Sequence, residues 1–297
     1  MHTFSNSLFP AGDINAGIDD NNEQQPILFP SMLIGRDKET KELAETFKSV
    51  CGGSSALTLI SGQAGIGKTS LVKNISSRVI EAGALFISVK ADQYNQDAPY
   101  QTYAEVVKTI IKHLLMLDDR MLASFKKSLS GTLGDDIHLL SNFIPEMKYI
   151  TGYPENKTIP ENGNPENRFK DSLSTFIKIT TGQYPGLTVF FDDLHWADSA
   201  TIKIIKHIID EKIPNLYILG AYRDNEVSEN HPLMKIITGA STSPGGLHLL
   251  KLNALEYIDF EDIITAALKE SSPRIKKLSL YIFNKTGFNG KIVNFDK

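Results

Sequence analysis

The sequence predicts an α/β protein with a mostly parallel five-stranded sheet that helices cover on both faces. Short segments that are apolar throughout, rather than alternating, are the first observation behind this prediction: residues 56–61, 84–89, 187–191, 216–222 and 247–252. Helical segments lie between most of them, which is the second observation. Strands that are apolar on both sides and alternate with helices are typical of a parallel sheet inside a layered α/β domain.

The N-terminal elements follow from local composition. Residues 1–30 are rich in Asn, Asp, Gln, Gly and Pro, which predicts a disordered tail. A helix should follow, with Asp37 as its N-cap, because apolar residues then recur at helical spacing. The strand 56–61 leads into a second helix that begins at about Lys68 and ends near Gly83.

The later elements are read in the same way. Residues 103–119 have the broad apolar face of a strong helix after the strand 84–89. Residues 151–168 carry three prolines and few apolar side chains, which indicates a surface loop or insertion before a helix near 168–181. After the strand 187–191, Asp198 can cap the next helix.

Composition and charge argue against several classes of protein. The net charge of −4 and the pI near 6.0 provide no bulk attraction to nucleic acid or an anionic membrane. No apolar run approaches the roughly 20 residues that a membrane span needs. The single cysteine, Cys51, forms no intramolecular disulfide, and the N-terminus lacks a signal-peptide pattern. We therefore expect a cytoplasmic protein with no nucleic-acid partner and no membrane span.

The segment GQAGIGKT, Gly62 to Thr69, matches the phosphate-binding pattern G-x-x-x-x-G-K-[ST] between a predicted strand and a predicted helix. Glycines let the backbone curl around an anion, Lys68 neutralises terminal phosphates, and the Thr69 hydroxyl binds Mg²⁺. A chance match in a glycine-rich turn is the alternative, and the flanking elements argue against it. The predicted nucleotide-binding residues of this loop are Gly62, Gly65, Ile66, Gly67, Lys68, Thr69 and Ser70.

Two adjacent acids end the apolar run LTVFFDD. A P-loop site needs an acid at the end of another strand to hold Mg²⁺, and Asp192 has that position. Asp193 can then orient the attacking water or accept its proton, which makes it the predicted catalytic carboxylate of a Walker B pair. The alternative is a solvated pair at the strand end or a helix cap. His195 and Trp196 follow, and we expect them to pack the next helix against the sheet and hold Asp193 in place.

With these motifs in hand, the chain resembles a known family. The segments LIGRDKE, LISGQAGIGKTSLV, VFFDDLHWADSATIKII and ILGAYRDNEVSENHPL occur in the order found in the AAA ATPase 16 type of STAND ATPases. These domains occur in large bacterial signalling proteins beside kinase-like and histidine kinase domains. The resemblance covers about residues 31–285 and implies a three-layer αβα P-loop NTPase core over residues 31–252.

The resemblance also implies roles for two arginines. Arg36 of LIGRDKE matches the Gly-Arg element near the nucleotide base, and Arg223 matches the arginine that senses the γ-phosphate. In the family's strand order, the strand before Arg223 lies between the P-loop strand and the Asp192 strand, so a guanidinium there can reach the terminal phosphate. Without the resemblance, Arg223 is equally well explained as a surface ion-pair partner of Asp224 or Glu226.

The C-terminal segment departs from the family pattern. The family has a Gly-Asn-Pro-Phe-Phe element where this sequence reads NKTGFNGKIVNFDK and stops. We therefore expect residues 253–297 to form a truncated helical lid, either of a stand-alone core or of a remnant of a longer protein.

Two functions remain open from the sequence. The first is a slow Mg²⁺-dependent ATPase switch that takes ATP/ADP as its nucleotide, with Lys68, Asp193 and Arg223 as catalytic residues and Thr69 and Asp192 as metal ligands. Self-association or kinase-like signalling proteins are its expected partners. The second is a nucleotide-binding interaction module, or a gene remnant, without significant turnover. Turnover per bound nucleotide distinguishes the two.

Overall fold

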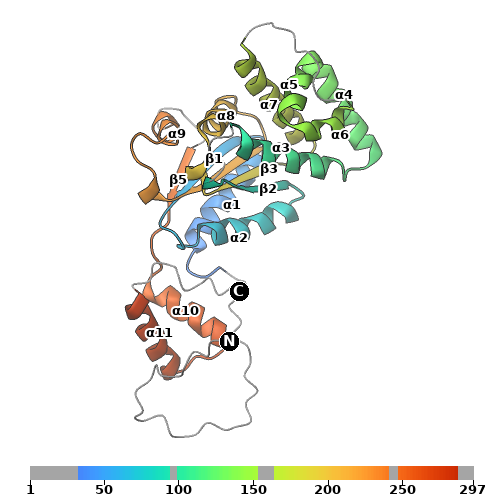
Figure 1. Cartoon of the computed structure of the whole chain (residues 1–297). Helices are drawn as coiled ribbons and strands as arrows, with labels where there is room; N and C mark the ends of the chain where they lie inside the picture. The colour runs from blue at the N-terminus through green and yellow to red at the C-terminus, as the bar shows by residue number, and fades with distance from the viewer. Residues whose placement is uncertain (1–32, 94–98, 153–163, 241–246, 287–297) are drawn as a thin grey trace, which may run out of the picture.

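A five-stranded parallel sheet forms the centre of the part of the protein that the structure describes. The computed structural model describes residues 33–93, 99–152, 164–240 and 247–286 (Figure 1). The strand order is β2-β3-β4-β1-β5, and every neighbouring pair is parallel. The strands are β1 (Ser55–Ser61), β2 (Leu85–Lys90), β3 (Leu187–Asp192), β4 (Leu216–Tyr222) and β5 (Leu247–Lys251). The predicted α/β fold class is confirmed, and each predicted strand boundary lies within one residue of the observed one.

Helices cover both faces of the sheet and make the three layers that the sequence predicts. One face packs against α1 (Asp37–Cys51) and α2 (Lys68–Glu81), through apolar side chains such as Leu43, Val50 and Leu71. The other face packs against a larger apolar core. The helices that cover this face are α3 (Gln101–Leu114), α7 (Pro165–Thr181), α8 (Ser199–Asp210) and α9 (Met234–Ala240), and apolar side chains of three further helices extend the same core.

Three further helices lie outside the second layer, where the sequence analysis placed none. These are α4 (Asp119–Leu133), α5 (Ile137–Phe143) and α6 (Lys148–Thr151), and α4 and α5 pack against α7 (Figure 1). The helix expected over 103–119 ends at Leu114 instead. The reason is Asp118, whose carboxylate accepts the backbone N–H groups of Arg120 and Met121 and so starts α4 as a separate helix.

Other helix starts depend on capping side chains. Helix α7 begins at Pro165, three residues before its predicted start near 168, because the Asn164 side chain accepts the backbone N–H of Glu166. Asp198 caps α8 as predicted, through the backbone N–H of Thr201. Asp37 is not an N-cap, because it is the first residue of α1 and Arg36 occupies the capping position. Residues 153–163, most of the predicted loop, lie outside the described residues, as does the predicted tail 1–30.

The described C-terminal residues form a helical hairpin. Helices α10 (Tyr257–Leu268) and α11 (Pro273–Thr286) pack on each other through a small core of Phe260, Ile264 and Ile275 (Figure 1). Figure 1 shows this hairpin beside the three-layer core rather than within it. The assignment of residues 253–297 to a lid stays a prediction.

Gly220 in β4 provides a test of the packing that places the end of β3. An added Cβ would lie 2.6 Å from a methyl carbon of Leu194 and 2.8 Å from one of Leu59, and both leucines are buried. We therefore expect Gly220→Ala to lower the free energy of unfolding by about 1–3 kcal/mol, the usual effect of overpacking a core. Denaturant titration measures this difference.

Gly131→Ala in α4 is the matched control, because an added Cβ there meets no atom within 4 Å. Alanine is favoured over glycine inside a helix by up to about 1 kcal/mol, so this variant should be slightly more stable than the parent. A Gly220→Ala protein as stable as the parent would contradict the packing described here.

Candidate functional site

The loop from Gly62 to Thr69 joins β1 to α2 at the carboxyl edge of the sheet. Its backbone explains the glycines in the pattern. Gly62 has φ 153° and Gly67 has φ 100°, values that residues with a side chain rarely adopt. At Gly62 a Cβ would also lie 3.0 Å from both the carbonyl oxygen of Leu252 and a side-chain carbon of Ile66. The loop conformation therefore requires glycine at these two positions.

Lys68 opens α2, and its ammonium folds back over the loop. Nζ donates to the carbonyl oxygens of Gly62, at 2.7 Å, and Gln63, at 2.8 Å, and the side chain is buried. Burial lowers the pKa of Lys68, and the carboxylate of Asp193 opposes that shift. The cation that the sequence assigns to phosphate binding is thus held at the loop. Ser70 lies one residue beyond Thr69 and is exposed.

Thr69 and Asp192 meet although they are 123 residues apart in the chain. The Thr69 hydroxyl donates to Asp192 Oδ2 at 3.0 Å, and Asp192 Oδ1 accepts the backbone N–H of Asp193 at 3.1 Å. A hydroxyl oxygen beside a carboxylate is the kind of oxygen pair from which Mg²⁺ is held together with substrate phosphates. The residues predicted to hold Mg²⁺ therefore fit such an ion.

Asp193 has an unusual backbone and two cationic neighbours. Its φ of 50° and ψ of 42° are left-handed, a conformation that aspartate tolerates better than most residues and that is found preferentially at functional sites. The side chain is nearly buried. Lys90 Nζ lies 3.3 Å from Asp193 Oδ2, and Arg223 Nε lies 3.8 Å from Oδ1. The Asp193 carboxylate is therefore paired with two cations.

Arg223 follows β4, which lies between β3 and β1 as the sequence analysis expected. Its Nη1 donates to Glu226 Oε1 at 2.6 Å, so the alternative interpretation of Arg223 as an ion-pair partner of Glu226 describes a contact that is present. The guanidinium carbon also lies 4.9 Å from the centre of the Trp196 ring. Arg223 is thus beside the predicted catalytic acid, but it is held by protein groups.

Arg36 is placed behind the phosphate loop. Its Nη2 donates to the carbonyl oxygens of Ile66, at 3.2 Å, and Asn253, at 2.6 Å, and its Nη1 pairs with Glu39 at 3.0 Å. The side chain is buried. The guanidinium therefore ties the loop to the segment that leads into α10, and the predicted role of Arg36 near the nucleotide base stays a prediction.

His195 is buried in the short turn after Asp193 and packs against Trp196. Its Nε2 lies 3.1 Å from Glu226 Oε2, without the alignment of a hydrogen bond. Burial lowers the pKa of His195, and the Glu226 carboxylate opposes that shift. The carbonyl oxygen of His195 accepts from His231 Nε2 at 2.9 Å. This last contact joins the end of β3 to the segment after β4.

The sequence analysis missed Lys90 as a neighbour of the site. A signal for Lys90 was available, because it follows the apolar run 84–89 and therefore lies at the same edge of the sheet as Asp192. In the sheet, Lys90 is in register with Asp192. Glu226 was considered only as a surface partner of Arg223, and its approach to His195 depends on the turn after β4.

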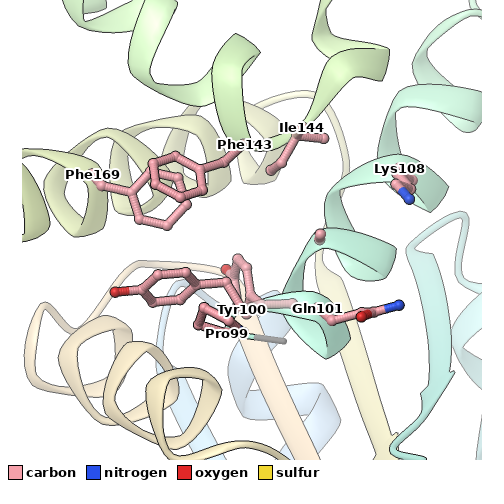
Figure 2. A pocket seen from close by; sticks show the side chains of 9 residues that line it. Pro99, Tyr100, Gln101, Lys108, Phe143, Ile144 and Phe169 are labelled. Carbon is pink, nitrogen blue, oxygen red and sulfur yellow. The ribbon is translucent and has the colours of Figure 1, made fainter. Parts of the chain in front are cut away.

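A cavity of about 210 Å³ lies away from these residues, between α3, α5 and α7 (Figure 2). Tyr100 lies on one side of it, opposite the adjacent rings of Phe143 and Phe169, and Lys108 lies at one end (Figure 2). None of the predicted site residues lines it. Its link to the site is indirect, because the backbone N–H of Tyr100 donates to Asp198 Oδ1 at 3.2 Å.

Comparisons with known proteins agree with this geometry. The model of the AAA ATPase domain family matches residues 32–219, more than half of the chain. The chain belongs to the AAA ATPase domain family. This AAA ATPase domain has the P-loop ATPase fold, and nucleotide binding is the function that the family supports. In the parts of the chain that the structure describes, no helix combines the length and apolar character needed to cross a bilayer.

A curated relative gives the domain a context. Over 179 residues the chain is 30% identical to hybrid signal transduction histidine kinase G of Dictyostelium discoideum. The match covers 60% of this chain and 5% of that protein, so the chain spans only a small part of the length of the relative.

Two solved structures are similar in outline. The ORC2 protein of Aeropyrum pernix, solved as ADPNP–ADP complexes, is 16% identical with a TM-score of 0.47, covering 86% of this chain and 58% of that one. A Walker-type ATPase of Pyrococcus abyssi is 13% identical with a TM-score of 0.45, covering 88% and 66%. Likeness at this level says nothing about function.

Proposed function

We propose that this AAA ATPase domain binds ATP with Mg²⁺ at Gly62–Thr69, hydrolyses it slowly and serves as a signalling switch. The observation that carries the proposal is the convergence of Lys68, Thr69, Asp192, Asp193 and Arg223 at one edge of the sheet. The signalling role draws on the relative, whose name is that of a signal transduction histidine kinase. Cytoplasmic localisation and kinase-like or self-associating partners belong to the same proposal.

Each residue has a chemical task in this proposal. The Lys68 ammonium exchanges its hydrogen bonds to the loop carbonyl oxygens for contacts with terminal phosphate oxygens. The loop N–H groups bind the remaining phosphate oxygens. Thr69 and Asp192 hold Mg²⁺, which when bound neutralises charge on the phosphates. Arg36 fixes the loop from behind, and its backbone faces the base.

Hydrolysis needs one proton acceptor. Asp193 orients a water molecule and takes its proton as the water oxygen bonds to the γ-phosphorus and the bond to the ADP oxygen breaks. Arg223 binds the γ-phosphate oxygens, on which negative charge is concentrated. ADP and inorganic phosphate are the products.

A second candidate is a nucleotide-binding module without turnover. The contacts of Asp193 favour it, because Lys90 and Arg223 lie against the two carboxylate oxygens that would otherwise orient a water molecule. The two candidates differ in whether nucleotide binding releases Asp193 from these cations.

The test is calorimetric ATP binding together with phosphate release, measured for the chain over a range of protein concentrations. We expect binding that depends on Mg²⁺ and turnover well below the roughly 10 s⁻¹ typical of enzymes. Chelation of Mg²⁺ should abolish phosphate release. Binding without release at any concentration would select the second candidate, and absence of binding would overturn both.

A further inference from the structure

Two short turns surround Arg223 at neighbouring strand ends. The turn Leu194–Trp196 follows β3 and the turn Asp224–Glu226 follows β4. The guanidinium of Arg223 lies over the Trp196 ring and donates to Glu226. It is therefore held by an aromatic face and a carboxylate at once, besides its contact with Asp193.

The two holding groups are themselves anchored. Trp196 packs against the main core of the protein, and its neighbour His195 is buried beside Glu226. The hydrogen bond from His231 to the His195 carbonyl connects the first turn to the segment that follows the second turn. The arginine side chain is thus held between the two turns by Trp196 and Glu226.

The Arg223 side chain can nevertheless leave its contacts with Trp196 and Glu226. Its side chain is 26% exposed and that of Glu226 is 32% exposed, so water screens their attraction. A terminal phosphate offers a guanidinium two charged oxygens in a bidentate arrangement, which a partly exposed carboxylate contact does not match. Exchange of Glu226 for phosphate is therefore favourable once a triphosphate is bound.

We infer that Trp196 and Glu226 are positioning residues that hold Arg223 beside Asp193 and release it to the γ-phosphate of bound ATP. The inference rests on the proposed binding of ATP at Gly62–Thr69 and adds how the terminal phosphate is sensed. Transfer of Arg223 removes one of the two cations from Asp193. Binding of the γ-phosphate therefore also frees the Asp193 carboxylate, which is the proton acceptor in the proposed hydrolysis.

The chain contains its own reporter, because Trp196 is its only tryptophan. We would record tryptophan emission while adding the Mg²⁺ complex of β,γ-imido-ATP or of ADP, and measure binding of each by calorimetry. The expected result is a shift in emission with the triphosphate analogue and none with ADP, because only the former withdraws the guanidinium from the indole. In Arg223→Gln the two nucleotides should give the same emission.

Glu226→Gln tests the carboxylate. The amide keeps the shape but loses the charge that competes with phosphate, so the affinity for β,γ-imido-ATP relative to ADP should rise about two- to fivefold, the range for a partly exposed ion pair. A role in folding alone would not raise this ratio. Glu229→Gln, an exposed residue after the same turn, is the control and should leave it unchanged.

The outcomes separate the inference from the proposed function. If both nucleotides bind but give equal emission, or Glu226→Gln leaves the affinity ratio as in the parent, the inference is overturned and ATP binding stands. If neither nucleotide binds, the proposed function fails and the inference fails with it.

Discussion

Replacement of Asp193 by asparagine should lower the rate of ATP turnover by about 10²- to 10⁴-fold, the usual contribution of a positioned acid or base, while nucleotide stays bound. The physical reason is that an amide of nearly the same shape cannot take a proton from water. Asparagine also tolerates the left-handed backbone found at this position, so the turn should survive. Phosphate release and calorimetric affinity for Mg²⁺·ATP provide the two measurements.

The matched control is Asp224→Asn. Asp224 lies beside Arg223, and its charge also acts on Lys68, so this variant makes the same change in charge close to the site. It carries no proposed proton-transfer role, and its turnover should stay within a few-fold of that of the parent. Equal turnover in Asp193→Asn and the parent would show that another group serves as the base.

The environment of Asp193 bears on this result. Because Lys90 and Arg223 approach its two oxygens separately, loss of the carboxylate removes the partner of two cations at once. Those cations are then available to phosphate oxygens. We therefore expect the affinity of Asp193→Asn for ATP to equal or exceed that of the parent.

The core of the fold was predictable because its signals are local. Each strand is a short apolar run, and the glycine pattern of the loop follows from backbone geometry that only glycine readily adopts. The strands and the loop depend on chain segments whose own composition specifies them. The position of β4 between β3 and β1 was implied by the family resemblance alone, and it brings Arg223 close to Asp193 because the carboxyl ends of parallel strands meet at one edge.

The rest depends on contacts between distant residues. The hydrogen bond from Arg36 to the carbonyl oxygen of Asn253 joins residues 217 positions apart in the chain, and no local sequence pattern predicts it. Likewise, α5 and α6 are short helices, and the capping residue Asp118 interrupts what reads as one long apolar helix before α4. The Trp196 ring was expected to pack the next helix against the sheet, and its contact with Arg223 depends on the relative positions of two turns, which no local pattern gives.

The contact between Arg36 and Asn253 gives the C-terminal hairpin a physical link to the phosphate loop. The backbone N–H of Leu252 donates to the Ser61 carbonyl at 2.8 Å, immediately before the loop begins. Gly35, next to Arg36, has φ 73° and closely approaches the side chain of Asp259 in α10. A change in loop conformation on nucleotide binding would therefore act on the segment that carries α10 and α11.

Replacement of Lys68 by alanine should weaken ATP binding by about 30-fold to 4,000-fold, which corresponds to the roughly 2–5 kcal/mol lost when one partner of a buried charged contact is removed. The phosphates would then have only the loop N–H groups and Mg²⁺ as partners near the β- and γ-positions. Calorimetric titration with Mg²⁺·ATP measures the effect.

Lys73→Ala controls for the loss of positive charge, because Lys73 lies one turn further along α2 and is exposed. Its affinity for ATP should match that of the parent, since water screens a distant surface charge. Lys68 also donates hydrogen bonds to two loop carbonyl oxygens, so its loss can destabilise the loop. The thermal unfolding of the Lys68→Ala protein must therefore be recorded alongside its binding of ATP. A folded Lys68→Ala protein that binds ATP as tightly as the parent would remove the phosphate loop from the proposed site, because the buried ammonium would then serve only to hold the loop.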